Sequence, residues 1–341
     1  MLKSWVSDPA KAEFAAIREP KHMAAVWEDL AKSFPRYFES LVAPKVAQGD
    51  DLLAALKTNE RFRVKEPKKP KEAPKPDFSA LTRAVAEYEP EADQYREFFD
   101  VERLAEFRQD DPDAFKTELS KKCPVIRQTL MSPLTDLKEW KIKYRAAKSA
   151  TLLATFEHLR ALADGYLATH GAEADFDGYD DPEDFAMEDF NEETTGVPGV
   201  IGGGIKSALV YRLEPRVFAP RSTSALFGLY FLTEEKSYRL RSETSEFIMV
   251  DDKRLGRDDG WKNRFNMKVA QNYWYPYELF VFYAMRLWRL LRAACTEKGH
   301  ALDPAFRFVY VQAFLDHVCQ ENAEALKVLK GVDELSDFAH G

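Results

Sequence analysis

The chain has 341 residues, of which 45% are hydrophobic and 13% aromatic, and it carries a net charge of −8 at pH 7. This composition excludes a disordered chain, and the length is typical of two packed units. No run of about 18 uncharged apolar residues occurs, so we predict a cytoplasmic protein that makes no membrane contact. The cysteines Cys123, Cys295 and Cys319 are too scattered for a disulfide framework or a zinc site.

Charge is distributed unevenly along the chain. Residues 171–200 carry eleven Asp and Glu and no Lys or Arg, whereas residues 201–300 carry seventeen Lys and Arg against eleven Asp and Glu. Residues 61–76 are also basic, with seven Lys and Arg against two acids. Because a polyanion responds to the local field rather than to the total charge, the negative total does not exclude nucleic acid as a partner.

The N-terminal part predicts a small helical unit over residues 1–60. Ser7-Asp8-Pro9 has the pattern of a helix start, and apolar residues then recur at helical spacing from Trp27 to Leu41. The segment "VKEPKKPKEAPKP" follows, and its prolines exclude a helix or a central strand. Residues 61–77 are therefore predicted to be an extended Pro/Lys-rich linker.

The middle region, residues 78–171, is predicted to be helical, with breaks at Pro90, Pro112 and Pro124. Ser132-Pro133 then opens a periodic run that predicts one long central helix as far as His170. One face of this helix carries basic residues at spacings of three, four and three: Lys138, Lys141, Arg145 and Lys148. Such a stripe suits phosphates spaced along a nucleic-acid backbone, and the alternative is a solvated face opposite the core.

Residues 172–196 form an acidic segment in which aromatic residues are interleaved. Three interpretations stay open: a solvated loop, an acidic flap that docks on the protein's own basic surface and mimics phosphates, and a segment that binds a partner. The stretch "DFDGYDD" lacks the twelve-residue ligand pattern of a calcium-binding loop.

The stretch from Val197 to Leu213, "VPGVIGGGIKSALVYRL", opens an apolar helix with a Pro-Gly turn and three consecutive glycines. A Walker A loop requires glycine directly before the Lys-Ser pair, but here Ile205 precedes Lys206 and Ser207. The stretch resembles the helix-hairpin-helix DNA-binding motif, and the residues that match are Val197, Pro198, Gly199, Val200, Gly202 and Ala208. It departs from the motif by the additional Ile201 and by the glycine triplet.

The resemblance implies that glycines let backbone N–H groups approach a phosphate at a helix N-terminus without reading bases. The residues expected to contact nucleic acid here are Gly199, Gly202, Gly203, Gly204, Lys206 and Ser207. The alternative is a plain turn at the start of a helix.

The C-terminal unit, residues 197–341, contains the only predicted strands. "SYRLR" and "SEFIMVDD" are expected to pair as a small antiparallel hairpin. Asp251 follows the apolar run directly, Lys253 comes two residues later and Glu246 lies nearby, a pattern used by Mg²⁺-dependent nucleases at the end of a strand. Solvated hairpin turns have the same pattern.

A further helix, preceded by "NYWYPY", carries Arg286, Arg289 and Arg292 beside aromatic residues. This combination suits stacked single-stranded bases, and the alternative is a row of core aromatics edged by arginine side chains.

We therefore predict a mainly α protein, a helical bundle with a long central helix and one small antiparallel β-hairpin. The predicted function is that of an accessory or regulatory protein that binds the phosphate backbone of DNA or RNA without strong sequence readout. The alternatives are a nuclease, for which Mg²⁺ would be the only cofactor, and a protein-interaction subunit of a larger complex. Whether the chain is an enzyme stays open. Bacterial defence or mobile-element biology is the setting expected for a chain without familiar signatures, although no residue carries that expectation.

Overall fold

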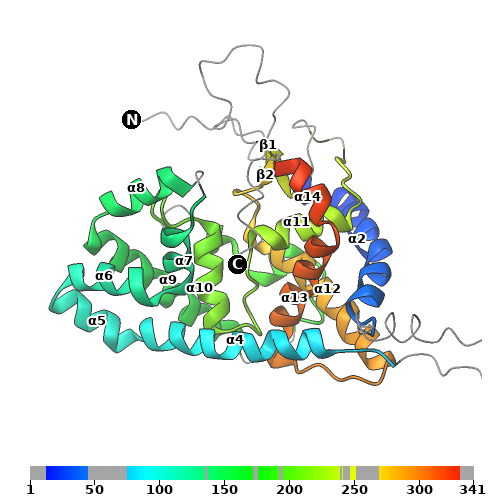
Figure 1. Ribbon diagram of the computed structural model, residues 1–341, viewed down its shortest axis with the longest axis horizontal. Coiled ribbons are helices and arrows are strands. Elements are labelled where there is room, and N and C mark those ends of the chain that lie inside the picture. Colours follow the sequence, from blue (N-terminus) through cyan, green and yellow to red (C-terminus); the bar gives the residue numbers. More distant parts are fainter. Residues whose placement is uncertain are drawn as a thin grey trace, which may run out of the picture.

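The computed structural model describes residues 13–44, 75–134, 137–171, 176–191, 195–238, 240, 246–250 and 269–330. This part is mainly α-helical with one two-stranded sheet, which confirms the predicted fold class (Figure 1). The α-helices are α2 (Pro20–Leu41), α4 (Ser79–Phe98), α5 (Val101–Gln109), α6 (Pro112–Lys122), α7 (Pro124–Met131), α8 (Lys138–Ala146), α9 (Ser149–His170), α10 (Gly203–Leu213), α11 (Thr223–Leu232), α12 (Tyr277–Glu297), α13 (Arg307–Glu321) and α14 (Ala323–Lys330). Short 3-10 helices are η1 (Ala16–Arg18), η3 (Pro182–Phe185), η4 (Glu188–Asn191) and η8 (Pro304–Phe306).

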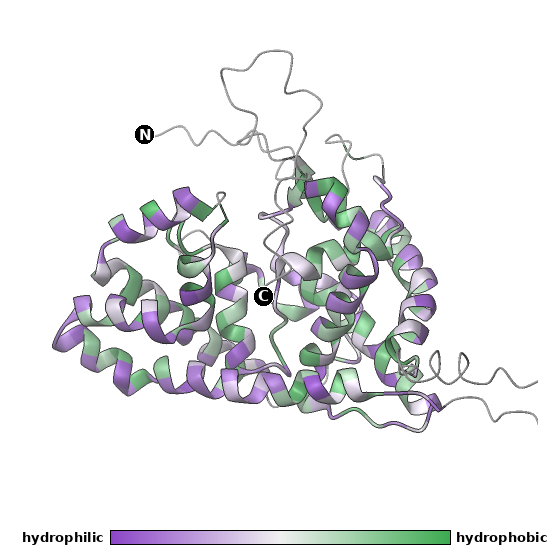
Figure 2. Cartoon of the chain, in the orientation of Figure 1, coloured by the Kyte–Doolittle hydropathy of each residue, from purple (hydrophilic) through white to green (hydrophobic). Residues whose placement is uncertain are grey.

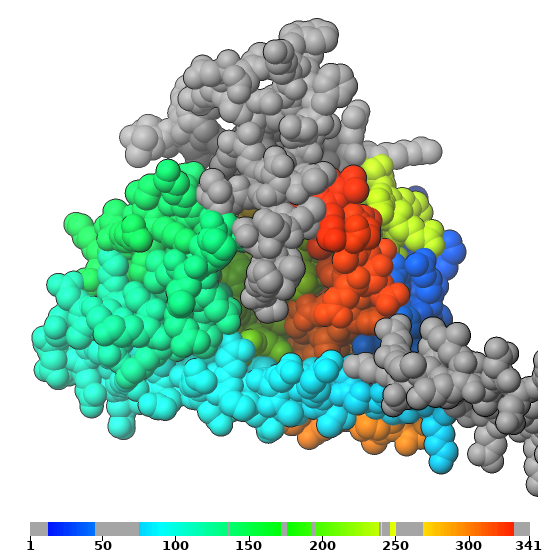
Figure 3. All heavy atoms as spheres, viewed as in Figure 1, coloured from blue at the N-terminus to red at the C-terminus, as the bar shows by residue number. Residues whose placement is uncertain are grey.

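The helices form two groups that lie side by side in Figure 1. In one group α5 and α6 pack against α9 and α7 packs against α6, and in the other α2, α11 and α12 pack around α13. Helix α4 runs along the lower edge of both groups and contacts α10 and α13 (Figures 1 and 3). In the hydropathy colouring α8 is mostly hydrophilic, which fits its position at the edge of the first group (Figure 2).

The predicted long central helix is two helices rather than one. Helix α8 ends at Ala146, and both Ala147 and Lys148 are extended, with ψ values of 134°, before α9 begins. The Lys116 ammonium on α6 donates to the carbonyls of Arg145 and Ala147, at 2.8 and 2.6 Å. These carbonyls are thereby satisfied without a continuing helix, which stabilises the break.

Proline positions follow the sequence prediction at two of three sites. Pro112 and Pro124 each occupy the first turn of a helix, and Asp111 caps α6 through the backbone N–H groups of Asp113 and Ala114. Helix α4, however, continues through Pro90. The predicted break at Pro90 is therefore wrong, because packing of α4 against α10 and α13 outweighs the one lost helical hydrogen bond.

The sheet pairs β1 (Ile248–Val250) with β2 (Val269–Gln271) in antiparallel register, Ile248 opposite Gln271. The predicted partner, "SYRLR", is not a strand at residues 237, 238 and 240, and its other two residues lie outside the described part. The hairpin prediction thus identified one strand correctly and its partner wrongly.

The N-terminal helix belongs to the larger core. Its apolar face, formed by Met23, Val26, Leu30 and Phe34, is buried, and α2 contacts α11, α12 and α13. Residues 1–12 and 45–74 lie outside the described part and include most of the predicted linker. Among the helices that are described, none is both long and apolar enough to cross a membrane.

Candidate nucleic-acid interface

The Pro-Gly stretch forms a tight turn. Val200 donates its backbone N–H to the Val197 carbonyl at 2.8 Å, and Val197 donates to the Ile201 carbonyl at 3.1 Å. Gly199 has a φ of +70°, the left-handed value that the third position of a type II turn requires after proline. Glycine at this position is therefore explained by backbone conformation alone.

Helix α8 holds this turn in place. The Trp140 indole N–H donates to the Val200 carbonyl at 2.8 Å, and the Lys143 side chain lies over Gly199, where its Cδ would be 2.9 Å from an added Cβ. The structure thus brings together two stretches that the sequence separates by about 50 residues, the predicted basic helix and the predicted glycine turn.

Helix α10 begins directly after the turn. Gly202 is its N-cap and offers no capping side chain, and Gly202 and Gly204 are both exposed. The segment that leads to the turn contains the 3-10 helix η4, while residues 192–194 lie outside the described part. The residues described between α9 and the turn therefore contain no α-helix to form the first half of a helix-hairpin-helix motif.

Lys206 and Ser207 point into the protein. Lys206 is 6% exposed, and its ammonium donates to the Phe190 carbonyl at 2.8 Å and to the Thr195 hydroxyl at 2.7 Å. Ser207 donates to the Gly204 carbonyl and accepts the backbone N–H of Arg221, both at 3.0 Å. This placement does not present either side chain to a phosphate.

The predicted basic stripe lies on the surface of α8 and at the start of α9. Lys138, Arg145 and Lys148 are exposed, and none of them forms a salt bridge with another described residue. Lys141 is half-buried and donates to the Ser132 carbonyl. Three cations are thus available to an external anion, and the fourth is partly engaged.

Two further exposed cations, Lys121 on α6 and Arg127 on α7, lie outside the predicted stripe. Ser120 on α6 hydrogen bonds with Tyr144 on α8 at 2.9 Å, which places the exposed Lys121 close to α8, and Arg127 on α7 is also exposed. Residues 116–148 carry nine Lys and Arg against three acids, a net charge of +6. A charge count over this whole range, rather than one helix at a time, would have found this signal. We call Lys121, Arg127, Lys138, Lys141, Arg145 and Lys148 the basic α6–α8 surface.

The acidic segment covers the arginines of α12 instead. Arg292 pairs with Asp177 at 2.6 Å, and Arg289 donates to the carbonyls of Phe176 and Tyr179 at 2.6 and 2.9 Å. The aromatic residues of the segment belong to the core, since Phe176 and Phe185 are almost fully buried. Of the three interpretations, docking on the protein's own basic residues describes residues 176–191, and Arg289 and Arg292 are engaged by this segment.

The residues of the nuclease alternative are only partly described. Glu246 is buried and accepts a hydrogen bond from the Tyr275 hydroxyl at 2.7 Å, while His22 contacts its second oxygen. Burial beside Glu246 holds the pKa of Tyr275 well above its usual range, so the phenol stays a donor. Asp251 and Lys253 lie outside the described residues. No group of three His, Cys, Asp or Glu in the described ranges could hold a metal ion.

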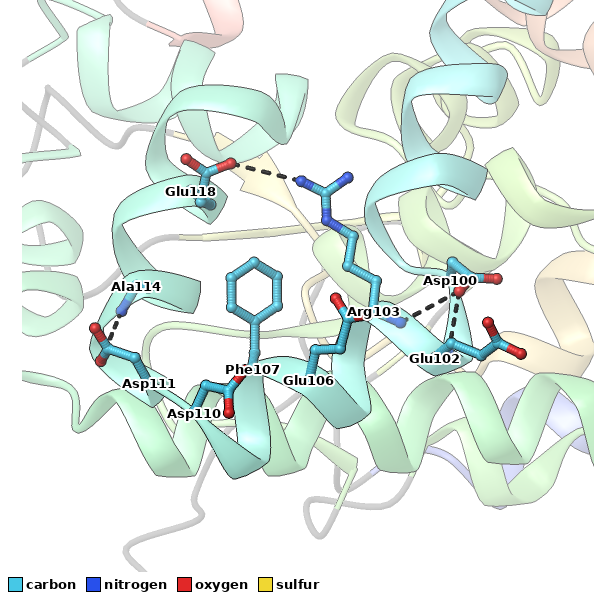
Figure 4. A pocket seen from close by; sticks show the side chains of 9 residues that line it. All are labelled: Asp100, Glu102, Arg103, Glu106, Phe107, Asp110, Asp111, Ala114 and Glu118. Atoms are coloured by element: carbon cyan, nitrogen blue, oxygen red, sulfur yellow. Dashed lines mark hydrogen bonds and ion pairs between the residues drawn. The ribbon is translucent and has the colours of Figure 1, made fainter.

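A groove of about 650 Å³ lies between α5 and α6 (Figure 4). Acidic residues dominate its lining, and Arg103, its one cation, pairs with Glu118 at 3.6 Å. Asp100 and Asp111 are occupied as helix caps. The negative charge makes this groove unsuitable for a polyanion.

No protein-family model, curated protein or solved structure matches the chain.

Proposed function

We propose that the protein binds the phosphate backbone of DNA or RNA through the basic α6–α8 surface, as an accessory or regulatory nucleic-acid-associated protein. The observation that carries the proposal is the exposure of Lys138, Arg145 and Lys148 without acidic partners among the described residues. The positive potential of an unpaired cation is not neutralised by the protein and can attract an external anion. The arginines of α12, in contrast, are already engaged by Asp177 and Asp180.

Backbone contact without sequence readout suits the composition of α8. Its sequence, KEWKIKYRA, provides ammonium and guanidinium groups but no Asn or Gln, the side chains that read adenine in the major groove. Four phosphate contacts would give a slope of about −3.6 for log K against log salt on duplex DNA.

The test compares two double variants that remove the same number of charges. Lys138→Ala with Arg145→Ala removes two cations of the basic α6–α8 surface, and Lys32→Ala with Arg36→Ala removes two exposed cations of α2 in the other helix group. Fluorescence anisotropy with labelled single-stranded DNA, duplex DNA and RNA at two salt concentrations measures affinity and slope. We expect the α8 pair to lower affinity on every sequence and to reduce the duplex slope by about 1.8. Equal behaviour of the two variants, or no binding by the wild type at low salt, would exclude the proposal.

A second candidate function, a protein-interaction subunit, is favoured by one observation. Met131 at the end of α7 and Ile142 on α8 are 77% and 56% exposed, and Lys141 beside Ile142 bonds to Ser132 beside Met131. Exposed apolar side chains that lie between cations can bind a protein partner whose surface is apolar and flanked by acidic residues. Ile142→Ser would weaken such a complex and leave the salt slope of nucleic-acid binding unchanged.

A further inference from the structure

The acidic groove between α5 and α6 continues onto α4. Three exposed acids of α4 and three of α5 each follow one another at spacings of four residues, so each set lies on one face of its helix. The ion pair between Glu97 on α4 and Arg103 on α5, at 3.3 Å, joins the two sets. The six residues, which we call the acidic α4–α5 stripe, are Glu89, Asp93, Glu97, Glu102, Glu106 and Asp110.

The described part of the chain neutralises little of this stripe. Asp93 pairs with Arg96 at 2.9 Å. Apart from this pair and the one that joins the two sets, no salt bridge to the stripe occurs among the described residues. Like charges four residues apart on a helix destabilise it. The stripe is therefore a surface that gains from cations beyond those that the described residues supply.

Arg103 illustrates how the groove binds a guanidinium. Its Nη2 lies 3.6 Å from Glu118, and its Cζ lies 5.9 Å from the ring centroid of Phe107 (Figure 4). On the side of α4 it meets Glu97 and, at 5.5 Å, the ring of Phe98. Carboxylates beside aromatic faces form an environment that favours Arg and Lys side chains. The groove thus binds one guanidinium already, and the three α5 acids of the stripe line the rest of it.

A segment of opposite charge belongs to the same chain. Residues 61–76 carry seven Lys and Arg against two acids, a net charge of +5, and they include four prolines. Prolines favour an extended chain and restrict its unbound conformations, which reduces the entropy lost when such a chain binds along a surface. In charge and in composition this segment is complementary to the stripe.

The place of this segment in the chain brings it within reach of the stripe. Asp77 donates its backbone N–H to the Val42 carbonyl at 2.9 Å, so residues 45–74 leave and rejoin the described part near the start of α4. The 20 residues of α4 rise about 30 Å from there to the near end of the groove. At about 3.1 Å per residue in an extended proline-rich chain, about ten residues before Asp77 cover this distance, so residues 61–66 reach the groove. Residues 45–60 can then span up to about 50 Å for the return.

We propose that residues 61–76 bind along the acidic α4–α5 stripe of their own chain. Arg61, Arg63 and Lys65 bind in the groove between α5 and α6, and the cations that follow them pair with the exposed acids of α4. The interaction is electrostatic, so it weakens as the ionic strength rises. It is independent of nucleic-acid binding, since the groups that hold the segment are carboxylates.

The experiment measures a distance within the full chain by pulsed electron spin resonance. Spin labels are attached through Val64→Cys, between the cations that enter the groove, and Gln109→Cys, an exposed position at the end of α5. The native cysteines are buried and do not compete for the label. We expect a distance below about 20 Å at low salt, because α5 is only about 14 Å long. A segment that is not bound centres near the start of α4, more than about 30 Å away.

A matched pair of triple variants tests the stripe. Both remove three exposed acids, the first from the groove and the second from α2, α12 and α13. The groove variant should lose the short distance and keep or raise its Tm, because it removes like charges from one helix face. The control variant should retain the short distance, and about 1 M salt should lengthen it. The groove variant is Glu102→Gln, Glu106→Gln and Asp110→Asn, and the control is Glu28→Gln, Glu297→Gln and Glu321→Gln.

Three results would overturn the proposal. A long, broad distance distribution without the triple substitutions excludes binding of the segment, and equal distances in the two triple variants exclude the stripe as its site. A short distance in a mixture of chains that carry one label each means that the segment binds a second copy instead. Nucleic acid is absent from every sample, so failure of this proposal and failure of phosphate-backbone binding are separate results.

Discussion

Replacing Lys206 by Met tests whether this lysine is structural or binds phosphate. The methionine retains most of the apolar stem but removes the ammonium that donates to the Phe190 carbonyl and the Thr195 hydroxyl. Two buried acceptors then lose a charged donor, at about 1–3 kcal/mol each, while the cost of burying a charge disappears. We expect the free energy of unfolding to fall by about 2–4 kcal/mol.

The assay is urea denaturation combined with thermal unfolding. With an unfolding entropy of about 2 cal/mol/K per residue, 1 kcal/mol shifts the Tm of a chain of this length by about 1.4 °C, so the expected decrease is about 3–6 °C. Lys138→Met is the matched control, since it removes an exposed lysine of α8. It should change stability by less than about 0.5 kcal/mol and reduce the duplex salt slope by about 0.9. If Lys206→Met instead weakens DNA binding at unchanged stability, the structural role assigned to Lys206 is wrong.

Three further substitutions test the packing. Phe185→Ala should destabilise by about 3–5 kcal/mol in urea, because this residue of the acidic segment is fully buried, whereas a solvated loop would show almost no effect. Gly203→Ala should cost about 1–3 kcal/mol through its clash with Arg221, and Gly202→Ala, with open space, less than about 1 kcal/mol. Burial raises the pKa of Asp316, so its ionisation lowers the stability of the protein as pH rises above the usual carboxyl range. Asp316→Asn, which cannot ionise, should therefore stabilise the protein more near pH 7 than near pH 3.5. Urea midpoints at the two pH values measure this difference.

Local signals in the sequence predicted helices well where a cap or an apolar period marks them. Asp111-Pro112 starts α6 and Ser222 caps α11 through the Ala225 N–H at 3.0 Å. The end of α8 could not be predicted, because the Lys116 side chain that satisfies its carbonyls comes from another helix. The partner of β1 could not be predicted either, since three-residue strands carry no usable period.

The candidate site shows the same division between local and tertiary information. The turn at Gly199 follows from Pro-Gly chemistry, and the cations of α8 are visible as a stripe. Lys206 is buried against carbonyl and hydroxyl groups that precede the turn. Arg221 is buried against a glycine 18 residues earlier in the chain. The residues next to each cation in the sequence therefore did not indicate its burial. Sequence patterns therefore predicted where the cations are but not which of them reach solvent.

The packing of α2 has a consequence for biosynthesis. Its apolar face is complete when residue 41 has been made, but the helices that bury it, α11 to α13, are complete only at residue 321. At 5–20 residues per second, Val26, Leu30 and Phe34 stay uncovered for roughly 15–55 s during translation. During that interval the nascent chain presents an apolar helix that chaperones can bind.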